Sequence, residues 1–206
     1  FVRKPTAKLY SSQAREDAGL EISFNTELPV LGRERDMLEV WTPKQPMWIH
    51  EHDVIVHSTS DEDSVTSAVY RDRRNVSGEA LVEMARQFIG LPYVWAGTSG
   101  FGFDCSGFTY SLYRAFGISI PRDAKDQAAA GEAVARDKLL PGDLLFYAYD
   151  RGKGTVHHVA MYVGNGQMIH SPKSERPVEI IAVSTPAYEV EFAGARRFLT
   201  SPISLK

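Results

Sequence analysis

The stretch Phe103-Asp104-Cys105-Ser106-Gly107-Phe108 holds the only cysteine among 206 residues. From Cys105 to Phe116, apolar side chains recur at the spacing of one helix face. Asp104 is a typical helix N-cap, and Gly117 is typical of the residue just beyond a helix end. The pattern predicts a helix of about 12 residues with Cys105 in its first turn. The positive end of the helix dipole would favour a thiolate there, while a buried structural cysteine is the alternative.

Length and composition set limits on the rest of the chain. A chain of 206 residues with 43% hydrophobic residues forms one large domain or two small ones. A net charge of −3 and a pI near 6.1 argue against a nucleic-acid partner. No stretch approaches about 18 consecutive apolar residues, so no membrane span is expected. A single cysteine excludes an internal disulfide framework.

The first 57 residues contain short apolar segments separated by turn residues. Strands of this length and spacing predict a small all-β barrel over residues 1–60, with Leu38, Val40 and Trp48–Ile49 in its core. The histidines there suggest zinc, but no cysteine or second close pair completes a site, so surface histidines are the preferred interpretation. Mixed charges with little apolar content predict a linker over residues 61–76. The expected strands are 7–10, 21–24, 28–31, 38–41, 47–49 and 54–56, and the histidines are His50, His52 and His57.

Residues 77–206 show helical patterns first and strand patterns afterwards. Ser77 should cap a helix that runs to about Ile89, with Leu81, Met84, Ala85 and Phe88 buried. A short helix is expected over residues 126–135. Strands are expected over 143–149, 156–164, 167–170, 178–183 and 192–198, which is an α+β pattern with an antiparallel sheet. The glycine-rich segment 96–102 lacks the Lys-Ser/Thr ending of a phosphate-binding loop, so nucleotide binding is rejected.

A nucleophilic cysteine needs an imidazole within hydrogen-bond reach, and that imidazole needs an orienting partner. The candidates are His157, His158 and His170, on two strands joined around the hairpin signal Asn165–Gly166. With a strict two-residue loop, His158 and His170 point to opposite faces. With an odd, three-residue loop and a glycine bulge, Ala160 faces His170, and His158 shares its face as a diagonal neighbour.

We therefore predict the odd loop, and His158 rather than His157 as the partner of His170. Adjacent strand residues point to opposite faces, which excludes a zinc site built from all three histidines. A pair of ordinary strand histidines is the alternative.

At these residues the sequence resembles the NlpC-type cell-wall peptidases, a papain-like cysteine peptidase family. The resemblance covers residues 77–200, and the amino-terminal barrel resembles the bacterial SH3-like modules of that family. Within the family, the segments 95–105 and 156–162 resemble the YkfC-like γ-D-glutamyl-L-diamino acid endopeptidases. The matching pieces are Pro92–Gly97, Phe103–Phe108, Ile120–Arg122, Pro141–Phe146, His158–Gly164 and Met168–His170.

The resemblance implies a papain-like catalytic domain over residues 77–206 that cuts murein stem peptides between D-Glu and the diamino acid, in fragments with a free N-terminal L-Ala. Cys105 is the implied nucleophile, His158 the base and His170 the residue that orients the base. Tyr93, together with the backbone N–H of Cys105, is expected to hold the oxyanion. No metal or organic cofactor is required.

Substrate contacts are expected around the nucleophile. The resemblance implies that Asp104 and Ser106 hold the substrate amino group, which suits a carboxylate facing an ammonium. Trp95 would form a wall of the substrate groove, and Arg122 or Lys173 could bind a substrate carboxylate. Helix capping alone for Asp104 and core packing for Trp95 are the alternatives.

Three features depart from the expected pattern or oppose the proposed chemistry. A carboxylate at Asp104 would raise the pKa of Cys105, and the imidazolium of His158 has to outweigh it. Ala124 stands where the subgroup usually has serine. The chain has room for one SH3-like module where the relatives carry two, so a further module upstream of the chain or associated with it is an expected partner.

Two other functions stay open at this point. The same residues could serve an amidase or acyltransferase with a different acyl substrate, because papain-like folds support several acyl transfers. An inert papain-like domain could instead act as a wall-binding module. The substrate class implies a bacterial cell envelope or secreted location, or a cytoplasmic recycling role.

Overall fold

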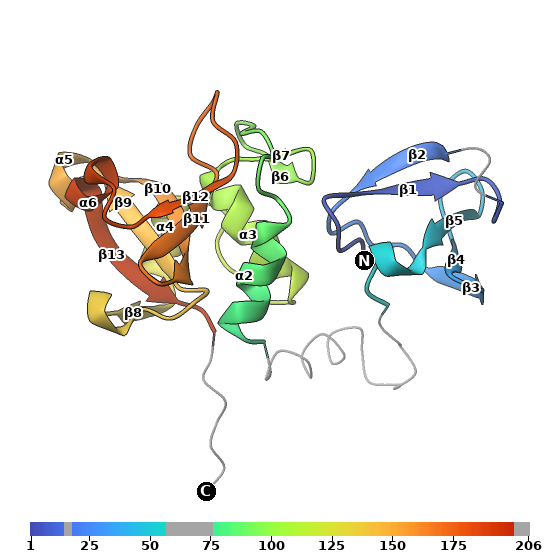
Figure 1. Cartoon of the computed structure of the whole chain (residues 1–206), viewed down its shortest axis with the longest axis horizontal. Helices are drawn as coiled ribbons and strands as arrows, with labels where there is room; N and C mark the ends of the chain where they lie inside the picture. Colours follow the sequence, from blue (N-terminus) through green and yellow to red (C-terminus); the bar gives the residue numbers. More distant parts are fainter. Residues whose placement is uncertain (15–17, 57–75, 200–206) are drawn as a thin grey trace, which may run out of the picture. The chain divides into compact units, whose positions relative to one another are not determined.

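A computed structural model describes residues 1–14, 18–56 and 76–199 (Figure 1). The chain divides into two compact units. The first is Phe1–Ser58 with Ser99–Phe101, and the second is Thr59–Thr98 with Gly102–Lys206. The linker predicted over residues 61–76 lies almost wholly outside the described residues.

The first unit is built on one antiparallel sheet of five strands, in the order β2-β1-β5-β4-β3. A short 3-10 helix, η1 (Glu51–Asp53), follows the last strand. The strand predicted over residues 54–56 is not formed, since Val54 makes only an isolated bridge with Val2. The strands are β1 (Thr6–Tyr10), β2 (Ala18–Ser23), β3 (Val30–Glu34), β4 (Met37–Val40) and β5 (Met47–His50).

Strand register determines which side chains fill the core of this unit. Leu38 pairs with Ile49, and both side chains are buried, as predicted. Trp48 pairs with Glu39 on the opposite face of the same two strands, and it is only half-buried. The prediction that Trp48 lies in the core is therefore wrong, because neighbouring strand residues point to opposite faces.

The second unit combines helices with an antiparallel sheet of six strands, in the order β12-β11-β10-β9-β13-β8. This arrangement confirms the predicted α+β class. The helices are α2 (Gly78–Arg86), α3 (Cys105–Ala115), α4 (Ala124–Ala129), η3 (Arg136–Lys138), α5 (Tyr149–Gly152) and α6 (Pro186–Glu191). The strands are β8 (Glu132–Val134), β9 (Leu144–Ala148), β10 (Val156–Gly164), β11 (Gln167–His170), β12 (Glu179–Ala182) and β13 (Phe192–Arg197), with β6 (Thr98–Ser99) paired separately to β7 (Gly102–Phe103).

Helix α2 begins as predicted and ends earlier than predicted. The Ser77 hydroxyl accepts a hydrogen bond from the N–H of Ala80 at 3.2 Å, which caps the first turn. After Arg86 the backbone tightens into three-residue turns, such as that from Phe88 N–H to Ala85 C=O, so the last predicted turn is not α-helical. The predicted buried stripe is nevertheless correct, because the tight turn keeps Phe88 on the core side.

The segment after α4 contains a strand that the sequence pattern did not predict. The helix expected over residues 126–135 instead spans Ala124–Ala129, and β8 follows it. Gly131 lies between them with φ 73°, a left-handed conformation that stops a helix. Ala133 then pairs with Arg196 of β13, so sheet pairing decides the structure of this segment.

Helix α3 is held at both of its ends by buried contacts. It packs against α2 and β10, as Figure 1 shows. At its first turns Phe108 packs with Phe103 and Phe88, whose ring centroids lie 5.5 and 6.0 Å away. At its far end the hydroxyl of Tyr113 donates to the carbonyl of Gly142 at 2.6 Å. These contacts, together with the packing on β10, hold the first turn of α3, which carries Cys105.

Candidate active site

Cys105 is the first residue of α3, and the helix begins as predicted. Asp104 takes the N-cap position, and its carboxylate accepts a hydrogen bond from the N–H of Gly107 at 2.6 Å. The helix ends at Ala115, and Gly117 follows with φ 69°. The cap and the glycine therefore place the thiol at a helix terminus, where backbone N–H groups have no helical acceptor.

The thiol of Cys105 is neutral at rest. Burial raises its pKa, and the negative charge of Asp104 raises it further. The backbone N–H of Val159 in β10 forms a hydrogen bond with the sulfur and acts in the opposite direction. The backbone N–H groups of Cys105 and Ser106 lower the pKa too, as expected at a helix terminus, but burial and Asp104 outweigh them. The Val159 contact also places the sulfur beside the strand that carries His158.

The register of β10 and β11 is the one that brings two histidines to one face. Met161 pairs with Ile169, which sets Ala160 opposite His170, as predicted. The three-residue loop is wrong, however. Gly164 and Gln167 still pair, so Asn165–Gly166 form a two-residue turn, and the register shifts between Tyr162 and Gly164. The extra residue lies in the strand as a β-bulge, which changes register as effectively as an odd loop.

His158 and His170 meet on these adjacent strands. Nε2 of His158 lies 2.9 Å from Nδ1 of His170, and the two residues are only 4% and 0% exposed. The rings of Tyr147 and Tyr188 pack against the pair. Burial lowers the pKa of His158 well below its usual value and lowers that of His170 to about 4. Both imidazoles are therefore neutral near pH 7, with one proton between the two facing nitrogens.

His157 has a different environment from its neighbour. The pairing of β10 with β9 also shifts register between Val156 and His158, so His157 is the extra residue of a second bulge. Its ring stacks on that of Tyr149 at a centroid distance of 4.2 Å, and its Nε2 lies 3.1 Å from Glu191. The structure thus places His158, and not His157, against His170.

A guanidinium joins the two residues that flank Cys105 in the sequence. Arg122 donates to both carboxylate oxygens of Asp104, at 3.0 and 2.6 Å, and to the Ser106 hydroxyl at 2.9 Å. The Ser106 hydroxyl also approaches Asp104 at 3.4 Å. The sequence pattern did not predict this ion pair, because residues 104 and 122 are far apart in the chain. The substrate roles of these three residues stay predictions.

Gln127 is a site residue that sequence analysis missed. It is fully buried in α4, and its amide nitrogen donates to the carbonyls of Ser106 and Pro121 at 3.2 and 2.8 Å. Its amide oxygen accepts from the hydroxyl of Thr109 at 2.9 Å. One amide thus ties the loop that carries Arg122 to the first turn of α3. No sequence signal marked Gln127, because glutamine is usually exposed and its burial here depends on how α4 packs on α3.

The remaining predicted residues differ in exposure. Tyr93 forms a bridge with Phe103, and its pKa is raised by burial first and then by the field of Cys105, which keeps the phenol a hydrogen-bond donor. Trp95 is 85% exposed, which excludes core packing and leaves the groove-wall role a prediction. Lys173 is exposed in the loop between β11 and β12.

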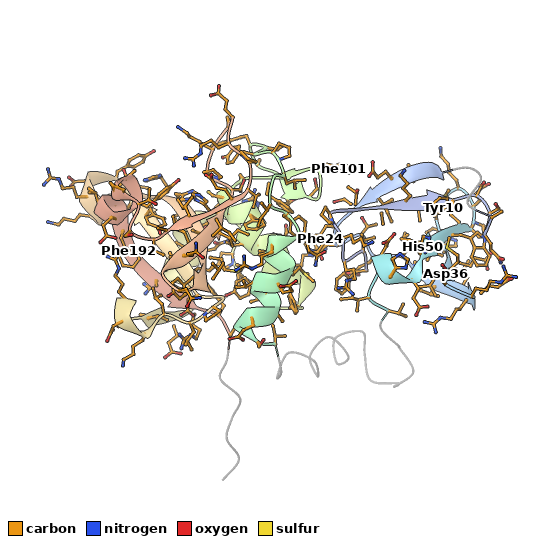
Figure 2. All side chains as sticks on the ribbon, viewed as in Figure 1. Tyr10, Phe24, Asp36, His50, Phe101 and Phe192 are labelled. Atoms are coloured by element: carbon orange, nitrogen blue, oxygen red, sulfur yellow. The ribbon has the colours of Figure 1, made fainter. Side chains whose placement is uncertain are left out.

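Metal binding and membrane crossing find no support in the part of the chain that the structure describes. Among those residues, no group of three acidic, histidine or cysteine side chains is placed to hold a metal ion. In the first unit Nδ1 of His50 lies 3.6 Å from Asp36, and its ring stands edge-on to Tyr10 (Figure 2). His57 lies outside the described residues. No described helix has the length and apolar character needed to cross a membrane.

Known proteins resemble both parts of the chain. Residues 90–197 match the NlpC/P60 family, and residues 2–57 match the YKFC SH3b2 domain. Over 97% of the chain, the sequence is 47% identical to a gamma-D-glutamyl-L-lysine dipeptidyl-peptidase of Bacillus cereus. The protein of the same name from Bacillus subtilis is 41% identical over 96% of the chain. The chain spans 57% and 61% of the lengths of these two relatives.

Solved structures agree with these matches. The crystal structure of an NlpC/P60 family protein from Bacillus cereus aligns with 97% of the chain at a TM-score of 0.83 and 47% identity, and the chain covers 62% of it. The NlpC/p60 domain of the peptidoglycan hydrolase SagA aligns with 59% of the chain at a TM-score of 0.51 and 36% identity, and 99% of that domain is covered. The family match covers just over half of the chain and includes Cys105, His158 and His170. The chain therefore belongs to the NlpC/P60 family of papain-like cysteine peptidases.

Proposed function

We propose that this protein is a cysteine endopeptidase that cleaves the bond between γ-D-Glu and the L-diamino acid of murein stem peptides. The observation that carries the proposal is the 2.9 Å contact between His158 and His170 on the strand pair beside Cys105. A thiol needs such an oriented imidazole in order to act as a nucleophile. The names of the two Bacillus relatives support the choice of substrate.

The reaction is an acyl transfer in two steps. His158 uses Nε2 for its contact with His170, so Nδ1 is the nitrogen that takes the proton from Cys105. The thiolate attacks the γ-carbonyl carbon of D-Glu, and the oxyanion accepts hydrogen bonds from the Tyr93 hydroxyl and the backbone N–H of Cys105. His158 returns the proton to the leaving amine as the C–N bond breaks. Water then attacks the thioester with His158 as base, which frees the γ-carboxylate and restores the thiol.

Substrate recognition is proposed for the residues around α3. Asp104 and Ser106 would hold the free amino group of L-Ala, with Arg122 balancing the charge of Asp104 when no substrate is bound. Trp95 would form one wall of the groove. Arg122 retains the proposed role towards a substrate carboxylate through the N–H groups that Asp104 and Ser106 do not use.

We further propose a division into an SH3-like barrel over residues 1–60, a linker over 61–76 and the peptidase domain over 77–206. The five-stranded sheet of the first unit and its match to the YKFC SH3b2 domain support the barrel. A second SH3-like module, upstream or associated, would complete the amino-group pocket. The expected place of action is the bacterial cell envelope or its surroundings, or cytoplasmic recycling of murein peptides.

The test is mass spectrometry of digests with defined peptides. The substrates are L-Ala-γ-D-Glu-L-Lys, its diaminopimelate counterpart and the N-acetylated form of each, and Cys105→Ala is the control. Release of L-Ala-D-Glu from the free peptides by the wild type alone is the expected result. Cleavage of the acetylated forms as well would remove the free-terminus requirement. Cleavage of none, with Cys105 still alkylated by iodoacetamide, would overturn this substrate and favour another acyl compound.

A further inference from the structure

A carboxylate stands behind the histidine pair, on the strand next to it. His170 in β11 pairs directly with Glu179 in β12. Side chains of directly paired residues emerge on the same face of a sheet. Oε1 of Glu179 accordingly lies 3.5 Å from Nε2 of His170, and the guanidinium of Arg176 forms an ion pair with that same oxygen.

One of the two ring nitrogens of His170 has a hydrogen-bond partner, and the other, Nε2, still needs one. Nδ1 is used by the contact with Nε2 of His158. Nε2 is fully buried and makes no hydrogen bond of normal length within the described residues. A buried ring nitrogen of this kind requires a partner, and the carboxylate of Glu179 is the acceptor that faces it. Such contacts are often long in a resting enzyme and shorten in the reacting complex.

The position of the proton on His170 determines whether His158 can act as a base. If Nε2 of His170 carries the proton and points it at Glu179, Nδ1 of His170 is an acceptor. Nε2 of His158 must then be the donor across the 2.9 Å contact, and Nδ1 of His158 is left unprotonated. In the opposite tautomer, Nδ1 of neutral His158 would carry the proton and could not accept another from Cys105.

We propose that Glu179, held by Arg176, fixes the tautomer of His170 and thereby keeps His158 ready to accept the thiol proton. Glu179 is thus a positioning residue that acts through His170, and its catalytic consequence rests on the proposed peptidase function. The arrangement extends the Cys–His–His series by one carboxylate, contributed by β12.

The charges around His170 are consistent with this role. His158 faces it from β10, Glu179 from β12, Arg176 from the loop before β12, and Tyr188 from α6 at a centroid distance of 5.1 Å. When His158 takes the proton, the negative charge of Glu179 stabilises the new cation through the intervening ring. The positive charge of Arg176 opposes that effect, so Glu179 offsets only part of the cost of a buried cation.

The first test needs no variant and no substrate. Two-bond proton–nitrogen NMR spectra of histidine-labelled protein distinguish protonated from unprotonated ring nitrogens. In the wild type at pH 7, His170 should be protonated on Nε2 and His158 on Nε2, with both Nδ1 atoms unprotonated. A protonated Nδ1 on His170 would overturn the proposal, whether or not any peptide is cleaved.

The second test compares Glu179→Gln with Glu175→Gln, a matched change of an exposed residue in the loop that precedes β12. The glutamine amide can donate to Nε2 of His170 and so favour the opposite tautomer. We expect iodoacetamide to alkylate Cys105 at least about 10-fold more slowly in Glu179→Gln at pH 7. The rates should converge at high pH, where the thiol ionises without a base.

With the murein peptide, Glu179→Gln should lower kcat by at least about 10-fold and leave KM within about 2-fold, while Glu175→Gln matches the wild type. Wild-type rates of alkylation and unchanged histidine tautomers in Glu179→Gln would overturn the proposal. Absence of peptide cleavage by the wild type would overturn the proposed function instead, because alkylation and NMR do not depend on the peptide.

Discussion

At the scale of single residues, burial shifts the pKa values of the two partners of the proposed proton transfer in opposite directions. It raises the pKa of Cys105 and lowers the pKa of His158, so both groups are neutral at rest. Each unit of pKa difference corresponds to about 1.4 kcal/mol against forming the charged pair. The charged pair must therefore be stabilised when substrate binds. Oxyanion donors and the exclusion of water supply such stabilisation in acyl-transfer enzymes.

The buried histidines should make the protein less stable in mild acid. Between pH 6.5 and about 4, unfolded histidines bind protons that folded His170 and His158 do not. The free energy of unfolding should then fall as the pH falls through this window, by about 1.4 kcal/mol per pH unit for each such histidine. Urea titrations at a series of pH values measure this slope. His170→Asn should lower the slope by the contribution of one histidine, about 1.4 kcal/mol per pH unit. An equal slope in the wild type and the variant would contradict the prediction.

The contacts of Arg122 with Asp104 and Ser106 should require the planar shape of a guanidinium. Arg122→Lys keeps the charge but cannot bind both oxygens of Asp104 and the Ser106 hydroxyl together. We expect a loss of about 1–3 kcal/mol in unfolding free energy, and slower alkylation of Cys105 at neutral pH because Asp104 is less well neutralised. Arg114→Lys, at the exposed end of α3, is the control and should match the wild type. Equal unfolding free energies and equal alkylation rates in the two variants would contradict this role of Arg122.

At the scale of elements, local signals predicted the parts that local chemistry controls. Helix α3 begins at the Asp104 cap and is followed by Gly117, as predicted from residue types alone. Every strand of the six-stranded sheet except β8 was found by its apolar run. The strand β8 was not predictable, because Ala133 pairs with the distant strand β13. The tight turns that end α2 early lead into a contact with another distant segment, where Gly90 N–H donates to the C=O of Val178, just before β12.

In the candidate site, too, local sequence predicted some features and missed those that depend on distant contacts. Hairpin parity predicted which histidines share a face, because side chains alternate along any strand. It could not show where the extra residue sits, since a loop and a bulge give the same register. The ion pair of Arg122 with Asp104 and the buried amide of Gln127 depend on how α4 and its preceding loop pack on α3. No spacing within the sequence encodes that packing.

The first turn of α3 should tolerate no added methyl group at Gly107. A Cβ there would lie 2.0 Å from the carbonyl oxygen of Gly97, a backbone atom that cannot turn aside. Gly107→Ala should therefore cost about 1–3 kcal/mol of stability and move Cys105 out of line with β10. Denaturant unfolding and the alkylation rate of Cys105 measure the two effects. Wild-type values for both would show that the helix can shift without consequence.

At the scale of the whole molecule, each of the two units has a core of its own. Leu38 belongs to the apolar cluster of the first unit, and Leu145 to that of the second. The family match and the histidine site lie in the second unit, while the match to the YKFC SH3b2 domain lies in the first. A substitution in one core should therefore act first on the stability of its own unit.

Core truncations should affect the units one at a time. Leu38→Ala should destabilise the first unit by about 2–5 kcal/mol and leave Cys105 alkylation unchanged. Leu145→Ala should destabilise the second unit by a similar amount and reduce alkylation. Calorimetry should resolve two transitions, of which each variant lowers one. A single transition that both variants shift equally would contradict separate cores.

Because of the two bulges of β10, the number of residues between them matters as much as which residues they are. One register shift lies between Val156 and His158, and the other between Tyr162 and Gly164. A one-residue insertion or deletion between them would turn His158 away from His170, whatever residue was added or lost. The turn at Asn165–Gly166 lies beyond the second shift, so an insertion there does not change the number of residues between the two shifts. Natural length variation and tolerated peptide insertions should therefore occur at that turn and be absent between His158 and Tyr162.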